Sequence, residues 1–167
     1  MSHSARLRAA ASIGLALALG LSLAACSNDK ELADASAFGA GAATPGSAQD
    51  FVVNVGDRVF FESDSTDLTP TATATLDKQA AWLQRYPRYT FIVEGHADER
   101  GTREYNFSLG ARRAQSVNDY LVSRGIASGR MRTVSYGKER PVAVCNDISC
   151  WSQNRRAVTV LDRGAAS

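Results

Sequence analysis

Apolar residues recur at helical spacing in two segments of the chain. The first segment repeats small or apolar side chains every three or four positions, at Ala72, Leu76, Ala80 and Leu83. Thr69 and Pro70 precede it as a typical N-cap and first helical residue, and Pro87 follows it as a helix-breaking residue. A second helix is predicted from about residue 104 to residue 124, ending before Gly125.

Four shorter segments rich in β-branched and aromatic residues are predicted strands, at residues 59–61, 90–94, 131–136 and 157–161. Helices separate the first three strands, and such connections are right-handed crossovers that give a parallel pair. The last strand follows a short connection that is non-helical or briefly helical, so we expect it to pair antiparallel. The pattern therefore predicts an α/β fold in which a small mixed sheet packs against two main helices.

The N-terminal part of the chain has a different pattern. Arg6 and Arg8 precede an apolar run at residues 13–23, which is too short to span a bilayer of roughly 30 Å. A positive start followed by a short apolar run is typical of a secretory signal. Residues 1–25 are therefore predicted to be a signal peptide.

The end of this segment, Leu23-Ala24-Ala25-Cys26, resembles the bacterial lipobox. The resemblance implies cleavage before Cys26 and acylation of both its thiol and its new amine, and two or more acyl chains anchor a protein stably. Lipoproteins retained in the inner membrane tend to have Asp at the next position, so Ser27 points to the outer membrane. The alternative is a chance cysteine behind an ordinary signal peptide.

Residues 26–49 are predicted to be a lipidated N-terminus and a flexible linker. From Ser27 to Gln49 there are seven Ala, three Gly and one Pro without sustained periodicity. Such a composition cannot bury enough surface to offset its ordering entropy. The folded domain is predicted at residues 50–164.

The charge balance argues against a nucleic-acid-binding protein. The chain has 19 basic and 17 acidic residues, and two of the basic residues belong to the predicted signal peptide. Arg155 and Arg156 stand at a predicted strand start, where two arginines usually form a solvated pair or a scaffold contact. The two histidines are His3, in the signal, and His96, which is expected to be a hydrogen-bonded structural residue. The sequence therefore predicts no catalytic residue, metal site or cofactor.

Cys145 and Cys150 lie close together in a predicted loop. An exported protein enters an oxidising compartment, so the pair is predicted to form a disulfide. A metal site would need about four ligands, and these two cysteines have no histidine near them. Two free thiols remain the alternative.

The stretch from Gly95 to Asn106 carries the most polar chemistry of the chain. It follows the end of a predicted strand, where ligand sites of α/β sheets are found. In the helix that follows, Arg113 lies in an apolar stripe between Leu109 and Val117 and needs an acceptor. Asp98 is the nearest good candidate, either as part of a ligand site or as one half of a structural Asp–Arg pair.

Six short blocks in the predicted folded domain resemble a known family. They are Gly95 to Thr102, Glu104-Tyr105-Asn106, Arg112-Arg113-Ala114, Val117 to Leu121, Ser135 to Glu139 and Asn154 to Val158. These blocks resemble the OmpA-like domain family and, more narrowly, the peptidoglycan-associated lipoproteins of the Tol–Pal system. The resemblance covers roughly residues 59–161. It implies an OmpA-like fold that binds the peptidoglycan stem peptide non-covalently, mainly through meso-diaminopimelate.

The resemblance implies a binding role for four residues. Asp98 would receive the ammonium group of the ligand, and Arg113 would receive a carboxylate, for which its planar fork of donors is suited. Asp64 matches the acidic position that follows the first strand in this family, and Leu109 would line the pocket. The family often has an aromatic residue before that Asp, whereas this chain has Ser63 and no ring to stack.

The resemblance also implies a lipid-anchored protein of the cell outer membrane whose domain faces the periplasm. It implies three partners, namely peptidoglycan, the outer membrane and TolB, the periplasmic propeller protein of the Tol system, with a role in envelope integrity and in constriction during cell division. A peptidoglycan-cleaving enzyme would need paired carboxylates, a zinc site or an activated nucleophile. The alternative function is a periplasmic protein-interaction adaptor that does not contact the wall.

Overall fold

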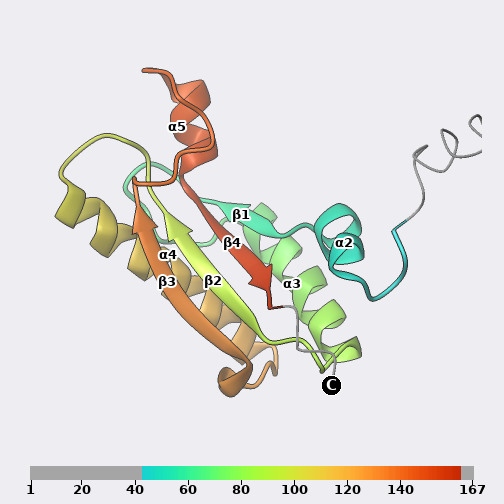
Figure 1. The fold of residues 1–167 in the computed structure, drawn as a ribbon. Helices are drawn as coiled ribbons and strands as arrows, with labels where there is room; N and C mark the ends of the chain where they lie inside the picture. The colour runs from blue at the N-terminus through green and yellow to red at the C-terminus, as the bar shows by residue number, and fades with distance from the viewer. Residues whose placement is uncertain (1–42, 163–167) are drawn as a thin grey trace, which may run out of the picture. The chain divides into compact units, whose positions relative to one another are not determined.

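The computed structural model describes residues 43–162 (Figure 1). Its helices are α2 (Ala48–Asp50), α3 (Pro70–Arg85), α4 (Arg103–Ser123) and α5 (Ile148–Asn154), with a π-type turn at Phe51–Val55 and a 3-10 turn at Ser128–Arg130. Its strands are β1 (Arg58–Phe60), β2 (Phe91–His96), β3 (Met131–Gly137) and β4 (Arg156–Leu161). The predicted signal peptide and Cys26 lie outside the described residues. Within residues 43–162, no helix combines the length and the apolar character that a membrane span requires.

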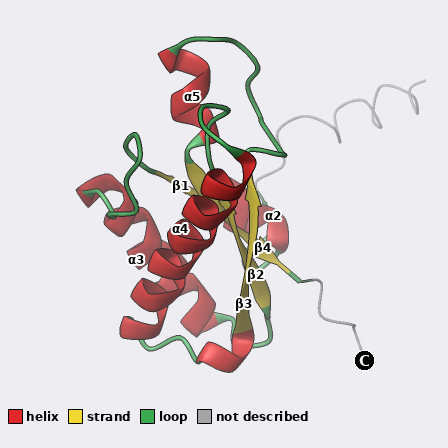
Figure 2. Ribbon diagram, turned by 90° about the vertical axis from the view of Figure 1, so that its left-hand side faces the viewer, coloured by secondary structure: helices red, strands yellow, loops and turns green. Residues whose placement is uncertain are grey.

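The four strands form one sheet in the order β1-β4-β2-β3. β2 and β3 are parallel and are joined through α4, while β4 lies between β1 and β2 and is antiparallel to both. The predicted mixed sheet is therefore confirmed, including its parallel pair and its antiparallel last strand. Figures 1 and 2 show α3 and α4 on one face of the sheet and α5 beyond the end at which β2 and β3 terminate.

Local sequence sets the ends of the two main helices. The side chain of Thr69 accepts a hydrogen bond from the Ala72 amide at 3.1 Å, and Pro70 follows as the first residue of α3. Thr102 caps α4 in the same way, accepting from the Tyr105 amide at 3.2 Å. Beyond the end of α4, Gly125 has a φ of 87°, a conformation that side chains rarely adopt. Both predicted helices are thus confirmed within a residue or two of their predicted ends.

The core lies between the sheet and the two helices. It is built from alternate residues of the strands and one stripe of each helix, chiefly Val59, Phe91, Val93, Ala157, Leu76, Ala80, Leu83, Ala114, Val117 and Leu121. Gly95 in β2 and Gly110 in α4 bring these two elements into backbone contact, because a Cβ on Gly95 would lie 1.8 Å from the Gly110 carbonyl oxygen. This contact fixes the first half of α4 against the end of β2.

The folded part begins before the predicted boundary at residue 50. The buried Asp50 carboxylate accepts hydrogen bonds from the Gly46 amide and from Trp82 Nε1, both at 2.8 Å. The Gly46 carbonyl in turn accepts from Arg88 at 3.2 Å and from the Tyr89 hydroxyl at 2.8 Å. Residues 43–49 of the predicted linker therefore belong to the folded part. The alanines and glycines of this segment show no periodicity, and its contacts are made by the buried Asp50 carboxylate and by the Gly46 carbonyl.

The connection between β3 and β4 contains α5, the brief helix that the sequence allowed. Asp147 caps this helix by accepting from the Ser149 amide at 2.7 Å. Cys145 and Cys150 are joined in the predicted disulfide. Asn154, at the end of α5, accepts from the amides of Val142 and Ala143 at 2.9 and 3.2 Å. These contacts join the parts of the connection to one another.

Candidate functional site

A surface pocket of about 220 Å³ opens at the carboxyl end of β2. It is lined by residues of the β1–α3 loop, the β2–α4 loop and the first turns of α4, namely Ser63, Asp64, Asp98, Arg100, Gly101, Tyr105, Asn106 and Leu109. Three of the four predicted binding residues, Asp64, Asp98 and Leu109, therefore line one pocket. The fourth, Arg113, is not in its lining.

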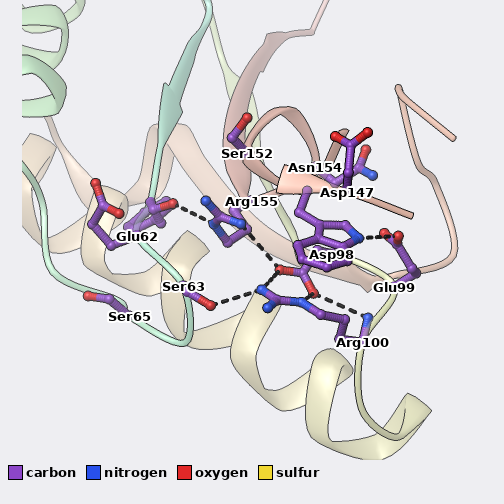
Figure 3. A network of polar contacts seen from close by, with 12 residues as sticks. Glu62, Ser63, Ser65, Asp98, Glu99, Arg100, Asp147, Ser152, Asn154 and Arg155 are labelled. Carbon is purple, nitrogen blue, oxygen red and sulfur yellow. Dashed lines mark hydrogen bonds and ion pairs between the residues drawn. The ribbon is translucent and has the colours of Figure 1, made fainter. Parts of the chain in front are cut away.

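Asp98 is the centre of the polar network beside this pocket (Figure 3). Its Oδ1 accepts from Arg100 Nε at 3.0 Å and from the Arg100 amide at 3.2 Å, and its Oδ2 accepts from Arg100 Nη2 at 2.7 Å. Arg155 Nη1 lies 3.5 Å from Oδ2. Burial opposes ionisation of this carboxyl, but the hydrogen bonds and charges of Arg100 and Arg155 outweigh it and lower the pKa of Asp98 below its ordinary value. Asp98 is therefore an anion at neutral pH.

Arg113 is fully buried, and its acceptors differ from the predicted one. Its Nε donates to the Ser65 carbonyl at 2.9 Å, its Nη1 to the His96 carbonyl at 2.8 Å and its Nη2 to the Glu62 carbonyl at 3.1 Å. The expectation that Asp98 is the partner of Arg113 is therefore wrong. Burial chiefly, and the nearby charge of Arg155, lower the pKa of Arg113 to about 10, so the guanidinium is still charged at neutral pH.

The three carbonyls come from the last residue of β2 and from the β1–α3 loop. Arg113 therefore joins this loop to β2 and α4 and shapes the wall behind the pocket. A guanidinium has five N–H donors, and these three bonds leave one N–H on each terminal nitrogen. Its plane also lies near the Phe61 ring, with 5.2 Å between Cζ and the ring centroid.

The β1–α3 loop brings Asp64 to the mouth of the pocket in an unusual conformation. Asp64 has a φ of 57°, which among residues other than glycine is most often found for Asn and Asp. Its carboxylate accepts a hydrogen bond from the Tyr105 hydroxyl, and this bond raises the pKa of Tyr105. Ser63, where no stacking ring was available, instead has its hydroxyl 2.8 Å from Arg100 Nη2. Both contacts tie the loop to the pocket.

Arg155 was interpreted from the sequence as a solvated or scaffold residue, and the solvated interpretation is wrong. Its side chain is buried, and its Nε donates to the Phe61 carbonyl at 3.0 Å. Through this bond and its contact with Asp98, Arg155 is a scaffold residue that joins the segments next to β1 and β4 to the pocket. Arginines next to each other in a sequence do not reveal whether their side chains are buried.

Sequence reasoning missed two residues beside the pocket. Arg100 lies in the Gly95 to Thr102 block but was not predicted to be a site residue, yet it donates three hydrogen bonds to Asp98. Trp151 was not among the predicted site residues, and its indole lies under the Arg100 guanidinium, with 4.2 Å from Cζ to the ring centroid. Its Nε1 donates to Glu99, which fixes the ring. The available signal was the Glu99-Arg100 pair directly after Asp98, but nothing in the sequence brought α5 to it.

His96 lies next to this site but is not a hydrogen-bonded residue as expected. Within residues 43–162 neither ring nitrogen has a hydrogen-bond partner, and the approach of Glu94 to Nε2, 3.7 Å, is too long for one. Burial, together with the charges of Arg156, Arg140 and Arg58, lowers the pKa of His96 to about 4. The ring is therefore neutral at pH 7, and the Glu94 contact is not an ion pair.

This environment predicts an acid-sensitive stability. In the unfolded chain a histidine binds a proton near pH 6.5, whereas folded His96 does so only near pH 4. The free energy of unfolding should therefore fall by about 3 kcal/mol as the pH is lowered from 6.5 to 4. Asp98, whose pKa is lowered, contributes a further loss only below about pH 4.

The measurement is urea denaturation at several pH values for the wild type and for His96→Phe. The variant keeps a ring that can stack on Tyr136, whose centroid is 5.6 Å from that of His96. It should lose most of the pH dependence between 6.5 and 4. If the free energy of unfolding falls equally with pH in both proteins, groups other than His96 cause the acid sensitivity.

Metal binding has no support in the part of the chain that the structure covers. No group of three or more His, Cys, Asp or Glu side chains there is placed to hold a metal ion. The chemistry of the pocket is instead that of a largely buried carboxylate flanked by guanidinium groups. Such a set suits a ligand that carries both an amine and a carboxylate.

Comparisons with known proteins agree with this geometry. A model of the OmpA family matches residues 60–155. The peptidoglycan-associated lipoprotein of Rhizobium meliloti is 67% identical over 147 residues, which cover 86% of this chain and 83% of that protein. Its counterpart from Mesorhizobium japonicum is 63% identical over 147 residues, covering 86% and 87%. The crystal structure of the peptidoglycan-associated lipoprotein from Burkholderia pseudomallei superposes with a TM-score of 0.62 at 40% identity, covering 64% of this chain and 90% of that chain. The chain therefore belongs to the OmpA family and, within it, to the peptidoglycan-associated lipoproteins.

Proposed function

We propose that this protein is anchored in the outer membrane by lipid on Cys26 and binds peptidoglycan non-covalently through its folded domain. It thereby ties the outer membrane to the cell wall. As part of the Tol–Pal system, with TolB as its periplasmic partner, it supports envelope integrity and constriction during cell division. Membership of the peptidoglycan-associated lipoproteins and the lipobox-like end of the signal peptide support this proposal.

The observation that carries the wall-binding half is the ionised Asp98 carboxylate in the pocket at the end of β2. This carboxylate receives the ammonium group of meso-diaminopimelate in the stem peptide. The two remaining N–H groups of Arg113 receive the carboxylate, and Asp64 and Leu109 form the adjoining walls. Each charge of the zwitterionic ligand then has a partner, which offsets the cost of removing these charges from water.

The test is cosedimentation of the purified protein with sacculi that contain meso-diaminopimelate. Truncating one partner of a desolvated charge pair costs about 2–5 kcal/mol, so Asp98→Asn should weaken binding by at least roughly 30-fold. Asp119→Asn is the matched control, because Asp119 is an exposed residue of α4 that contacts only Gln115 among the described side chains. Its affinity should equal that of the wild type.

Thermal unfolding of both variants shows whether a loss of binding reflects the site or the fold. A folded Asp98→Asn protein that cosediments with sacculi like the wild type would contradict the proposed site. A wild-type protein that does not bind sacculi would favour the adaptor function instead. The membrane half is checked on the same wild-type preparation by intact mass. The expected first residue is acylated Cys26, and an unmodified Cys26 terminus would contradict the anchor.

A further inference from the structure

The acidic group of the pocket is already occupied by a cation of the protein itself. Arg100 uses its amide, Nε and Nη2 to engage both oxygens of Asp98, at 3.2, 3.0 and 2.7 Å. Both residues line the pocket, so this ion pair belongs to its wall. A ligand ammonium that takes over these acceptor positions must therefore replace Arg100.

Of the two arginines on Asp98, only Arg100 is free to leave. The Arg155 side chain is 5% exposed and is also held by the Phe61 carbonyl. The Arg100 side chain is 43% exposed, and its remaining contacts are with the Ser63 hydroxyl and the Trp151 ring. A guanidinium that slides over an indole keeps its cation–π contact while it changes its hydrogen-bond partner.

Displacement leaves Arg100 without its anion, and this determines which ligands the pocket accepts. A ligand that brings only an amine gains Asp98 but breaks an existing ion pair and leaves a bare guanidinium beside the pocket. A ligand that brings an amine and a carboxylate exchanges partners with the Asp98–Arg100 pair, so that all four charges stay paired.

We infer that Arg100 is a specificity-determining residue that competes with the ligand ammonium for Asp98, and that, once displaced, it stays on Trp151 and binds a carboxylate of the ligand. This inference rests on the proposed binding of the stem peptide. It adds a cost that amine-only ligands cannot recover. The disulfide next to Trp151 helps to hold the platform, because Cys150 precedes Trp151 in α5.

The test measures the affinities of two soluble stem tripeptides by calorimetry, using the whole protein in detergent. One peptide ends in meso-diaminopimelate and the other ends in lysine, which lacks the second carboxylate. Removing the competitor in Arg100→Gln should strengthen binding of the lysine peptide about fivefold to tenfold, the range expected for a partly exposed bidentate ion pair. Binding of the diaminopimelate peptide should change less, because the gain at Asp98 offsets the loss at the carboxylate.

Two further variants separate competition from a structural role. Arg100→Lys keeps the charge but not the fork, so its discrimination between the peptides should fall between those of the wild type and Arg100→Gln. Trp151→Leu keeps the Asp98–Arg100 contacts but removes the ring on which Arg100 lies. It should therefore weaken binding of the diaminopimelate peptide more than binding of the lysine peptide. Arg132→Gln, an exposed arginine of β3 outside the pocket, should match the wild type for both peptides.

The inference is overturned if the wild type and Arg100→Gln discriminate equally between the peptides, which includes the case in which Arg100→Gln binds both peptides more weakly by the same factor. The proposed function fails in a different way, since the wild type would then bind neither peptide. Melting temperatures of all variants are recorded first. Should Arg100→Gln be unfolded, Arg100→Lys and Trp151→Leu decide the matter with the same peptides.

Discussion

Gly95→Ala is expected to cost this protein about 3 kcal/mol or more of its free energy of unfolding. The new Cβ would lie 1.8 Å from the Gly110 carbonyl oxygen and 2.6 Å from the carbonyl carbon, so no side-chain rotation relieves the clash. Helix α4 would have to move away from β2. That movement also loosens the core contacts of Ala114, whose Cβ lies 3.2 Å from the same point. For a domain of this size the melting temperature should fall by about 10 °C.

Gly129→Ala is the matched control, because a Cβ there meets nothing within 4 Å. Its free energy of unfolding should stay within about 0.5 kcal/mol of the wild type. Both variants are compared by urea denaturation at pH 7, where His96 stays neutral in the wild type. Equal midpoints for the two variants would mean that α4 is not held as close to β2 as the structure has it.

The second large effect is expected for Arg113→Ala. The truncation removes three hydrogen bonds from a fully buried guanidinium and leaves the carbonyls of Glu62, Ser65 and His96 without their donors. Groups left unsatisfied in this way cost about 1–3 kcal/mol each, although a loop can recover part of this by meeting water. We expect a total loss of about 3–5 kcal/mol and loosening of the β1–α3 loop.

This result has a consequence for the binding assay. Arg113→Ala should lose sacculus binding as well, and its affinity must be measured well below its own melting temperature. Arg112→Ala is the control, because Arg112 is the neighbouring exposed residue of the same helix. If folded Arg113→Ala binds sacculi like the wild type, Arg113 is a scaffold residue alone. If it is as stable as the wild type, the three carbonyl contacts carry no structural weight.

The helices and strands could be predicted because local signals set them. Thr69 and Pro70 mark the start of α3, and Gly125 marks the end of α4 in both sequence and structure. The parallel pair and the antiparallel last strand followed from the lengths of the connections. The short helix α2 could not be predicted, since its position depends on the Asp50 contact with Trp82, a residue far along the chain.

The candidate site was predicted in its parts but not in its pairing. Asp98 and Leu109 line one pocket because the end of β2 and the start of α4 are adjacent in sequence and in space, and Asp64 joins them from the β1–α3 loop. The partner of Arg113 was missed because its acceptors are backbone carbonyls, which every residue has and no sequence distinguishes. Arg100 was missed for a related reason, as its setting depends on Trp151 from α5.

The point at which the folded part begins also has a mechanical consequence. Gly46 is held by Arg88 and Tyr89, which precede the first residue of β2, whereas Asp98 follows its last residue. In the proposed tether, a pull between membrane and wall enters at one end of this strand and leaves at the other. The load therefore runs along the covalent backbone of β2, and the weakest links in its path are the contacts of Gly46 with Arg88 and Tyr89 and those of the ligand in the pocket. The hydrogen bonds of β2 with β3 and β4 lie beside this path, so tension between membrane and wall does not pull them apart, which suits a connector between two layers of a cell envelope.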